Sequence, residues 1–412
     1  MRKIKLAYLA PEIPALSATF VYNEIFQLEQ LGYSVVPFSV HRPGVSVTDK
    51  KLADLEAGVF YLYTQKKHAV LKENVLFLLK HPLRYLITLK TLLSDMFKVG
   101  VLSRTAMGLA FRFFYSVILA RQLLKTGVQH IHVHFAHVPA DIAMYAASLS
   151  GISFSVTAHA NDLFERAWLL AEKVNRAKFF VTISEFNREF LRQQGCNVDQ
   201  VIVVRCGVDV EHFNCQKKSG LSDLPKIGFI GRLVEKKGAD DLLLAVNELK
   251  KLGMDFKLVI AGSGPLEGHL TELARELGLS DECVSFAGAI AHSAIPKFLS
   301  ELDVFVLPCK QDRAGDMDGI PVVLMEAMLS GVSVISTRLS GIPELVVDRE
   351  TGLLVEPGNK IQLANAIQAL IEDKTLTKQL NNNAISKVKK EFNLKDNATQ
   401  LTKLFEKYVT SA

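Results

Sequence analysis

Cysteine and unbroken apolar runs are both scarce in this chain, and each shortage excludes a class of protein. The cysteines are few, odd in number and without CxxC spacing: Cys196, Cys206, Cys215, Cys283 and Cys309. Such usage argues against a disulfide framework or a zinc–thiolate site and favours a reducing compartment. The longest stretch without charge, residues 142–161, is broken by Ser, Thr, Gly, His and Asn, so it predicts a helix end and a strand rather than a membrane span.

The first residues also lack a long apolar run. The stretch MRKIKLAYLAPEIP is too short in apolar residues for a secretory signal and predicts a first β-strand. We therefore expect a cytoplasmic protein.

Acidic residues are scarce in one segment, residues 64–125. Eleven basic side chains stand there against Glu73 and Asp95, a net charge of +9 in a chain whose total is +5. The segment also contains the apolar runs VLFLLK, LRYLITLKTLL and LAFRFFYSVILARQLL. A helical segment that is both basic and apolar favours peripheral binding, with one face of the segment lying on an anionic membrane surface. The alternative is a set of core helices with solvated Lys and Arg. No recognition motif accompanies the charge, so nucleic acid is not an expected partner.

Hydrophobic residues are abundant and make up 49% of the chain. The chain is longer than a single hydrophobic core usually supports, so more than one domain is expected. Apolar β-like runs alternate with helical stretches in two series, the pattern of parallel sheets covered on both faces. The first series is IKLAYLA, YSVVPFSV, HIHVHF, SFSVTAH, FFVTIS and VIVVRCG; the second is KIGFIG, FKLVIAG, VSFAG, VFVLP, VSVIS and GLLVE.

These two series predict an α/β protein with two doubly wound, Rossmann-like domains, residues 1–211 and 212–385, joined near 212–225. Ligands of such sheets bind at the carboxyl ends of the strands, so we expect the domains to face each other across a cleft. The stretch 374–412 is helical and amphipathic, and 386–412 is expected to cross back to the first domain.

Residues 309–345 carry the most specific pattern. Pro321 suits the first position of a helix, VVLMEAML, which Ser330-Gly331 ends. A helix N-terminus that opens from a Gly-containing turn favours a phosphate. Glu326, about one turn inside, would reach vicinal hydroxyls such as those of a ribose, and Asp318 would reach hydroxyls attached to the phosphate. An ordinary amphipathic helix with one exposed acid is the alternative.

Two loops of the second series follow strands. In GFIGRLVEKKG, Arg232 and Lys237 lie five residues apart after Gly231, where two cations can hold a diphosphate; a plain basic loop is the alternative. The loop AGSGPLEG fails the dinucleotide fingerprint, but Gly262 and Gly264 allow close backbone approach to a base or ribose, or form a simple tight turn.

The first series offers polar residues at its own strand ends. His159 and Asp162 follow a strand, where a histidine could donate a hydrogen bond to a sugar hydroxyl or a reacting oxygen. A histidine that bonds only to a neighbouring loop is the alternative. Ser17 and Thr19 lie in a loop after the first strand and are expected to line the same region. His130, His132 and His134 share one strand face, with His137 nearby, so a metal site is conceivable. No nearby carboxylate or thiol completes a ligand set, which favours structural or substrate-lining roles over a metal.

Asp312, Arg313 and Asp316 could orient an acceptor or a donor sugar, although a solvated polar loop is the favoured interpretation of that segment.

Several of these motifs occur together in one family. The chain resembles the GT-B retaining glycosyltransferases of family four, and most closely their colanic-acid and exopolysaccharide branch. The motifs that carry this resemblance are GRLVEKKG, DMDGIPVVLMEAM, SGIPELV, TAHANDLF and NEIFQLEQLG. The resemblance covers nearly the whole chain. The family has Glu at both ends of the DMDGIPVVLMEAM pattern, and Asp318 stands here for the first of them.

The resemblance implies roles for named residues. Glu326 holds the nucleotide ribose; Asp318, Leu324 and the backbone at Gly319, Ile320 and Pro321 belong to the donor site. Arg232 and Lys237 match the diphosphate-binding pair, His159 matches a sugar-contacting histidine, and Ser184 matches a position on the acceptor side.

The implied activity is retaining, metal-independent and cofactor-independent transfer of a hexose. The donor is a nucleoside-diphosphate sugar, UDP-sugar favoured, and the acceptor is a lipid-linked oligosaccharide of exopolysaccharide biosynthesis. The alternatives are another GT-B-like enzyme, such as a nucleotide-sugar epimerase or a phosphorylase, and a non-catalytic membrane-associated scaffold.

Overall fold

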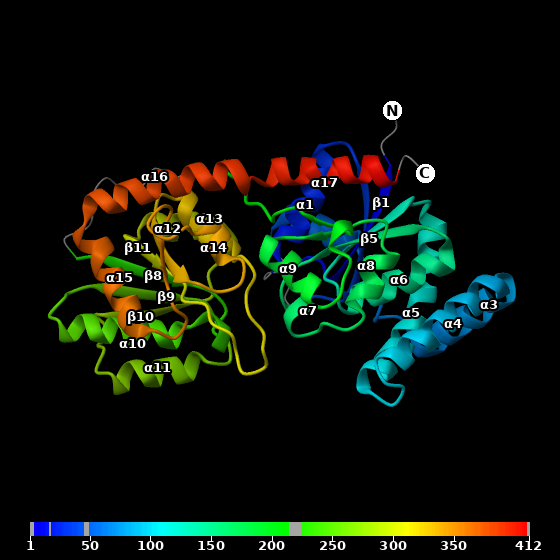
Figure 1. The fold of residues 1–412 in the computed structure, drawn as a ribbon, viewed down its shortest axis with the longest axis horizontal. Coiled ribbons are helices and arrows are strands. Elements are labelled where there is room, and N and C mark those ends of the chain that lie inside the picture. Colours follow the sequence, from blue (N-terminus) through cyan, green and yellow to red (C-terminus); the bar gives the residue numbers. More distant parts are fainter. Residues whose placement is uncertain (1–3, 16–17, 45–48, 214–223, 410–412) are drawn as a thin grey trace. The chain divides into compact units, whose positions relative to one another are not determined.

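The computed structural model describes residues 4–15, 18–44, 49–213 and 224–409, and Figure 1 traces the chain. The chain divides into two compact units. The N-terminal unit comprises Met1–Val204 and Leu394–Ala412, and the C-terminal unit comprises Arg205–Asn393. Much of the junction that the sequence places at 212–225 lies outside the described residues, and the division between the units falls earlier, after Val204.

The N-terminal unit contains a seven-stranded parallel sheet in the order β3-β2-β1-β4-β5-β6-β7. The strands are β1 (Lys5–Glu12), β2 (Ser34–His41), β3 (Phe60–Tyr61), β4 (His130–His134), β5 (Ser153–Ala158), β6 (Phe180–Thr182) and β7 (Val201–Val203). Successive side chains of a strand point to opposite faces of the sheet, so Ala7 and Leu9 of β1 belong to one hydrophobic cluster and Leu6 and Tyr8 belong to another. Two clusters on opposite faces make this sheet doubly wound.

Helices of the N-terminal unit cover both faces. The helices are α1 (Thr19–Gln30), α2 (Lys50–Ala57), α3 (Lys67–Lys80), α4 (Pro82–Lys98), α5 (Arg104–Thr126), α6 (Val138–Ser150), α7 (Asn161–Phe164), α8 (Leu170–Arg176), α9 (Glu185–Gln193) and the 3-10 turn η1 (Val198–Gln200). The uncharged stretch 142–161 spans the end of α6, strand β5 and the start of α7, as predicted. By length and composition α5 is a candidate membrane span, but 50% of its apolar window is buried, as in a core helix.

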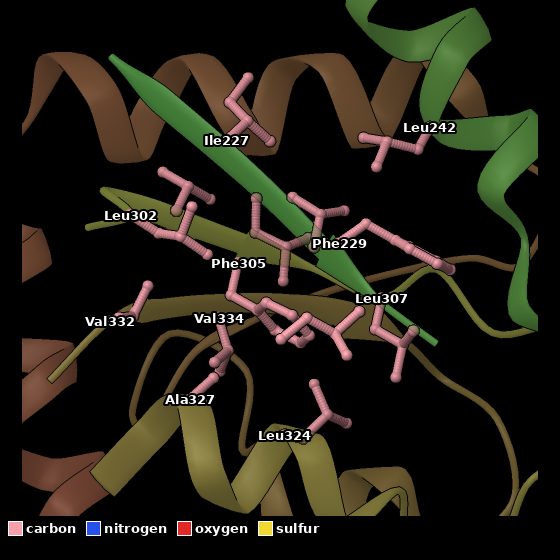
Figure 2. Close-up of a cluster of buried hydrophobic side chains, with 14 of the residues drawn as sticks. Ile227, Phe229, Leu242, Leu302, Phe305, Leu307, Leu324, Ala327, Val332 and Val334 are labelled. Carbon is pink, nitrogen blue, oxygen red and sulfur yellow. The ribbon is translucent and has the colours of Figure 1, made fainter. Parts of the chain in front are cut away.

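The C-terminal unit contains a six-stranded parallel sheet in the order β10-β9-β8-β11-β12-β13. Its strands are β8 (Lys226–Ile230), β9 (Lys257–Ala261), β10 (Val284–Gly288), β11 (Val304–Val306), β12 (Ser333–Thr337) and β13 (Leu353–Val355). Figure 2 shows Phe305 of β11 on the face of the sheet toward Leu324 and Ala327 of α13 (Val322–Leu329). Phe229 of the neighbouring β8 belongs to the same hydrophobic cluster and lies toward Leu242. The predicted α/β class and the two Rossmann-like domains are confirmed.

The remaining helices surround this second sheet and lead to the C-terminus. They are η2 (Glu235–Lys237), α10 (Ala239–Lys251), α11 (Glu267–Glu276), η3 (His292–Ala294), α12 (Ile295–Ser300), α14 (Ile342–Leu345), α15 (Lys360–Glu372), α16 (Lys374–Glu391) and α17 (Leu394–Tyr408). The predicted single stretch 374–412 is therefore two helices, separated at Phe392 and Asn393. Helix α17 belongs to the N-terminal unit, where Phe405 packs into the cluster beside α1.

Candidate functional site

The order of the C-terminal sheet places a reversal point between β8 and β11. From β8 the chain continues to β9 on one side, whereas β11 lies against the other side of β8. The loops that leave the carboxyl ends of these two neighbouring strands therefore start side by side. In open α/β sheets this is the position where ligands bind.

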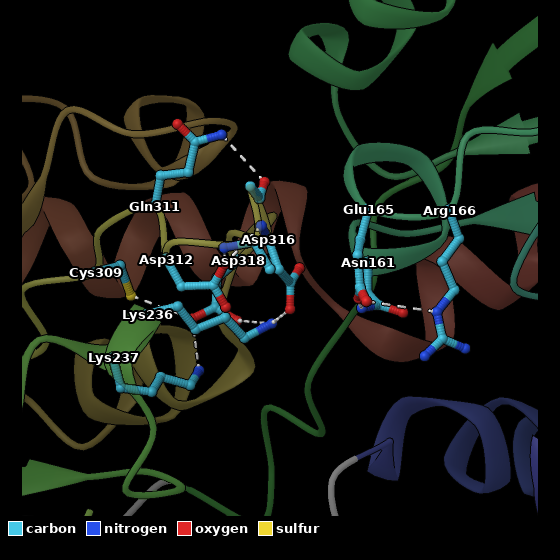
Figure 3. A network of polar contacts seen from close by, with 12 residues as sticks. Asn161, Glu165, Arg166, Lys236, Lys237, Cys309, Gln311, Asp312, Asp316 and Asp318 are labelled. Atoms are coloured by element: carbon cyan, nitrogen blue, oxygen red, sulfur yellow. Dashed lines mark hydrogen bonds and ion pairs between the residues drawn. The ribbon is translucent and has the colours of Figure 1, made fainter.

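Lys237, from the loop after β8, meets Asp318, from the segment after β11, at this point. The Lys237 ammonium nitrogen lies 2.8 Å from Oδ2 of Asp318, and the two side chains are only 16% and 15% exposed. Lys236 adds a second cation, 2.7 Å from Asp316 and 3.6 Å from Asp318. Figure 3 shows both lysines directed toward these carboxylates, with the Cys309 thiol also bonded to Asp318.

The electrostatics of this pair keep both members charged. Burial alone would raise the pKa of Asp318, but Lys237 and Lys236 outweigh it and lower that pKa. Burial likewise opposes the charge on Lys237, and Asp318 nevertheless raises the lysine's pKa. An anion at Lys237 would therefore meet a preformed cation.

Gly238 fixes the loop that carries Lys237. Its φ is +69°, in the left-handed region, and a Cβ there would lie 1.9 Å from the carbonyl oxygen of Pro308. The segment after β8 thus packs directly on the segment after β11. This contact brings Lys237 within reach of Asp318.

Arg232 lies on the same loop but faces solvent. Its side chain is exposed and forms no hydrogen bond or ion pair with the part of the chain that the structure describes. The structure therefore unites Lys237 and Asp318 of the predicted set and leaves Arg232 available to a ligand.

Close packing of backbone explains the glycines at the neighbouring strand ends. A Cβ on Gly262, whose φ is +143°, would lie 1.8 Å from the carbonyl oxygen of Gly231, and one on Gly264 would lie 2.5 Å from that of Leu233. The Gly231 N–H donates to the Ala261 carbonyl at 3.0 Å. The loops after β8 and β9 thus require small residues for their own contact, which the interpretation as a tight turn anticipates.

Helix α13 begins one residue later than predicted. Its first residue is Val322, and Pro321 is the N-cap, with an extended ψ of 125°, rather than the first helical residue. The first N–H groups of any helix lack intrahelical partners, so the anion-binding end remains, preceded by Gly319 and the buried Ile320. Leu324 of α13 is fully buried, and its side chain packs the helix against the hydrophobic core.

Glu326 is held inside α13 with one basic neighbour. It is 4% exposed, and its Oε1 lies 3.4 Å from Nε2 of His292, a residue that the sequence left unassigned. The hydrogen bond to Glu326 raises the pKa of His292, although burial acts in the opposite direction. A polar carboxylate is thus available about one turn inside the helix, as predicted.

In the N-terminal unit, His159 is held from several sides. It is 5% exposed, and its Nε2 lies 3.0 Å from Nδ1 of His134. The Asp162 carboxylate accepts the N–H groups of Ala136 at 2.6 Å and of His159 at 3.1 Å, and Asn187 donates to the His159 carbonyl. Burial raises the pKa of Asp162 against these backbone donors. Asp162 is fully buried, which favours a role in holding His159 over direct contact with an acceptor.

The other residues predicted for the acceptor side are mostly structural in their surroundings. Ser184 is fully buried and caps α9 by accepting the Asn187 N–H at 3.1 Å. Thr19 is the first residue of α1 and half-buried. Ser17 lies outside the described residues.

The histidine cluster differs from its prediction in one respect. A carboxylate does lie beside it: Glu24 of α1, whose Oε1 is 3.0 Å from Nε2 of His134 and 3.9 Å from that of His132. This contact could not be predicted from local sequence, because about 110 positions separate the partners and α1 shows only helical periodicity. Each of these atoms already has a protein partner: Tyr8 donates to Glu24 at 2.7 Å, and His132 Nε2 bonds Thr157 at 3.0 Å.

The C-terminal arrangement suits a ligand with two kinds of polar group. Lys237, Lys236, Arg232 and the helix end are groups of the kind that bind a diphosphate, and carboxylates such as Asp318 and Glu326 can accept hydrogen bonds from hydroxyls. Both kinds of group converge at the reversal point of one sheet.

Comparisons with known proteins agree with this geometry. Residues 213–387 match the family model for glycosyl transferases group 1, and residues 17–212 match that for glycosyltransferase family 4. The chain is 29% identical to the amylovoran biosynthesis glycosyltransferase AmsK of Erwinia amylovora over 98% of this chain and 100% of that protein. It is 36% identical to WcaL of Escherichia coli, a glycosyltransferase named for colanic acid biosynthesis, over 47% of this chain and 48% of WcaL.

Among solved structures, the chain is similar in fold to HepE of Anabaena in complex with UDP. The TM-score is 0.73 at 17% identity, covering 98% of this chain and 100% of HepE. At that identity the likeness concerns the fold.

Proposed function

The chain belongs to the group 1 and family 4 glycosyltransferases of GT-B fold, and from that premise we propose its reaction. It transfers a hexose from a nucleoside-diphosphate sugar, with UDP-sugar as the expected donor, to a hydroxyl of a lipid-linked oligosaccharide, with retention of anomeric configuration. The names of AmsK and WcaL support a place in exopolysaccharide biosynthesis, and the UDP complex of HepE supports the donor.

The observation that carries this proposal is the Lys237–Asp318 pair at the reversal point between β8 and β11. A diphosphate arriving there offers Lys237 an anionic partner of its own. Asp318 is then released from the lysine and can accept hydrogen bonds from the sugar. The same pair therefore serves both halves of the donor.

The remaining donor contacts belong to the same proposal. Glu326 accepts from the ribose hydroxyls, and Arg232, Lys236 and the α13 N-terminus share the charge of the diphosphate. Gly319, Ile320 and Pro321 present backbone to the sugar beside Asp318. These positively charged groups supply the stabilisation that a divalent cation supplies in other transferases, so we expect metal-independent transfer.

Retention of the anomeric configuration requires that the acceptor hydroxyl attacks C1 of the hexose on the same face from which the diphosphate departs. The bond between C1 of the hexose and the phosphate oxygen breaks, and the acceptor oxygen bonds to C1 on that same face. The leaving phosphate oxygen takes the proton of the acceptor hydroxyl. Lys237 and Arg232 stabilise the charge that grows on the departing diphosphate.

A lipid-linked acceptor requires a surface that meets a membrane, and helices α3, α4 and α5 present one. Fourteen of the seventeen large hydrophobic side chains that are exposed in the described chain fall between residues 71 and 124. On α3 they form one stripe, Leu71, Val75 and Leu79, at helical spacing.

Exposed cations border these apolar stripes. Lys66, Lys67, Lys72, Lys80 and Lys90 are exposed and form no ion pair with a described residue. Each cation near an anionic surface contributes about 1 kcal/mol to attraction. We propose that this face, named here the α3–α5 surface, holds the enzyme peripherally on anionic lipids.

The Lys237→Ala and Glu326→Ala variants test the site. Each should lower sugar transfer by about two orders of magnitude or more, while circular dichroism stays unchanged, because Lys237 stabilises the departing diphosphate and Glu326 holds the ribose of the donor. Lys251→Ala, on the exposed end of α10, is the matched control and should transfer normally. Near-normal turnover in both site variants would refute the assignment.

Thermal-shift screening with UDP-, GDP- and ADP-sugars identifies the donor, because a ligand that binds the native state raises the melting temperature. Failure of every sugar nucleotide to shift it would favour a non-catalytic scaffold. Interconversion of a free sugar nucleotide without acceptor would favour an epimerase.

A further inference from the structure

The side chain of Cys309 lies at the candidate donor site, and the proposed reaction gives it no role. Cys309 follows β11 closely and is fully buried. Its thiol donates a hydrogen bond to Oδ2 of Asp318, with Sγ 3.4 Å from that oxygen (Figure 3). The same oxygen lies 2.8 Å from the Lys237 ammonium nitrogen. A thiol and an ammonium group therefore share one carboxylate oxygen.

Two hydrogen bonds hold the backbone of Cys309. Its N–H donates to the Leu307 carbonyl at 2.9 Å, and its carbonyl accepts from the Thr337 hydroxyl at 2.5 Å. Thr337 ends β12 and is fully buried. A cysteine has one rotatable bond before its sulfur, so a fixed backbone leaves the thiol few positions. Asp318 therefore faces a hydrogen-bond donor that is fixed in place.

The three donors at Asp318 differ in how they respond to a phosphate. Lys237, and Lys236 at 3.6 Å from Oδ1, are cations on flexible side chains, and each can turn toward an arriving anion. The thiol stays neutral, because burial and Asp318 raise the pKa of Cys309 well above its usual value, although Lys237 acts in the opposite direction. A neutral thiol offers a phosphate no charge, so it stays with the carboxylate.

We propose that Cys309 is a positioning residue whose S–H group holds Oδ2 of Asp318 while Lys237 turns to the diphosphate of the donor. The carboxylate then keeps its direction and accepts hydrogen bonds from hydroxyls of the donor sugar. This inference rests on the proposed function for the sugar and the diphosphate, whereas the contact between the thiol and the carboxylate does not depend on it.

Substitutions of Cys309 separate hydrogen bonding from packing, since a buried cysteine can act only as a small apolar residue. Cys309→Val removes the donor and should lower sugar transfer about tenfold, the scale of one lost hydrogen bond to a charged group. The Kd of UDP, which carries no sugar, should stay unchanged. Cys309→Ser should recover most of the transfer, because its hydroxyl donates from the same place.

Two further variants guard this comparison. Cys309→Ala adds no bulk and should show the same loss as Cys309→Val, which excludes misfolding of the valine variant as the cause. Cys283→Val is the matched control: Cys283 is half-buried directly before β10 of the same unit, and the variant should transfer sugar normally.

Infrared spectroscopy of the S–H stretch tests the contact directly in the full-length protein. This band lies in a region free of other protein absorption, and it moves to lower frequency when the thiol donates a hydrogen bond. Subtracting the spectrum of Cys309→Ser isolates the Cys309 band from those of the other cysteines. Asp318→Asn should move the band to higher frequency, because an amide oxygen accepts more weakly than a carboxylate. Asp316→Asn should leave the band in place, since Asp316 bonds Lys236 instead.

Addition of UDP to the wild-type protein tests whether the contact persists when a diphosphate is bound. The Cys309 band should keep its low frequency at saturating UDP, because Lys237 exchanges its partner and the thiol does not.

Four outcomes would overturn the proposal. The first two are spectroscopic: a Cys309 band that does not move in Asp318→Asn, or one that UDP moves to the frequency of a free thiol. The others are kinetic: normal transfer by Cys309→Val, or a loss in Cys309→Ser as large as in Cys309→Val, which would assign Cys309 to packing. A confirmed thiol–carboxylate contact in a protein that neither binds UDP nor transfers sugar would instead reject the proposed function, and with it the role of Cys309 toward the sugar.

Discussion

Single residues at the C-terminal site neutralise one another where a charged ligand is expected to bind. Lys237 faces Asp318, and Lys236 faces Asp316, at 2.8 and 2.7 Å. Leaving one buried charge unpaired costs several kcal/mol, so the pairs keep the site stable without a ligand. In the proposed donor complex, a diphosphate would replace Asp318 as the anionic partner of Lys237. Hydroxyls of the sugar would donate hydrogen bonds to Asp318.

The His292–Glu326 contact predicts that donor affinity depends on pH. The hydrogen bond to Glu326 raises the pKa of His292, so the protonated pair is present at low pH and is lost as pH rises through that raised pKa. A ribose that occupies Glu326 removes the partner of the imidazolium and releases its proton. Donor Kd should therefore rise as pH falls through that raised pKa, by at most roughly tenfold per pH unit.

Calorimetric titration with the donor at several pH values measures this dependence. His292→Gln should flatten it, because the titrating partner of Glu326 is gone. His269→Gln, on the exposed face of α11, should keep the wild-type slope. A slope that survives in His292→Gln would mean that another group titrates.

Residue types at strand ends were predictable, whereas their partners were not. Lys237 and Asp318 lie in segments that follow strands, and Glu326 lies about one turn inside a helix, and those positions are visible in the spacing of apolar runs. The contacts of Glu24 with His134 and of His292 with Glu326 join segments far apart in the chain. Nothing in local periodicity encodes which helix face meets which strand end.

At the scale of elements, apolar alternation identified twelve of the strands that the structure describes. The strand β3 was missed because two residues, Phe60 and Tyr61, carry no period. The break between α16 and α17 was also missed, since Phe392 is apolar and no glycine or proline interrupts the pattern there. Packing of Phe392 into the C-terminal core ends one helix before the next begins.

The α3–α5 surface predicts binding to anionic vesicles. Replacing Lys66, Lys67, Lys72, Lys80 and Lys90 by Gln should weaken partitioning at least about a hundredfold, because each cation contributes about 1 kcal/mol near the surface. Flotation with phosphatidylserine vesicles measures the change. Added salt should weaken wild-type binding in the same direction, since it screens the attraction.

A second variant with equal loss of charge tests whether position matters. It carries Gln at five lysines of the C-terminal unit, and these are exposed as well: Lys251, Lys257, Lys297, Lys374 and Lys378. This variant should keep vesicle binding. Equal loss in both variants would show a general charge effect, and no loss in the first would reject the α3–α5 surface as the membrane contact.

At the scale of the whole molecule, the hydrophobic residues separate into distinct cores. One cluster lies wholly in the C-terminal unit; the other two lie in the N-terminal unit, and one of these includes Leu401 and Phe405 from the last helix. The chain passes between the units after Val204 and again after Asn393. Since each unit has its own hydrophobic core, we expect each to unfold as its own cooperative element.

Separate cores predict two calorimetric transitions, of which only one responds to the donor. Sugar nucleotide at about a hundred times its Kd stabilises the unit that binds it by about 2.7 kcal/mol, which raises that transition by roughly 5–10 °C. Leu243→Ala, in the C-terminal core, should lower the transition that the donor raises, because a buried leucine lost to a cavity costs about 2–5 kcal/mol. Leu119→Ala, equally buried in the N-terminal core, should lower the other transition and leave the donor's effect unchanged. If either variant moved both transitions together, the two units would unfold as one body, and the donor would stabilise the whole chain rather than the C-terminal sheet.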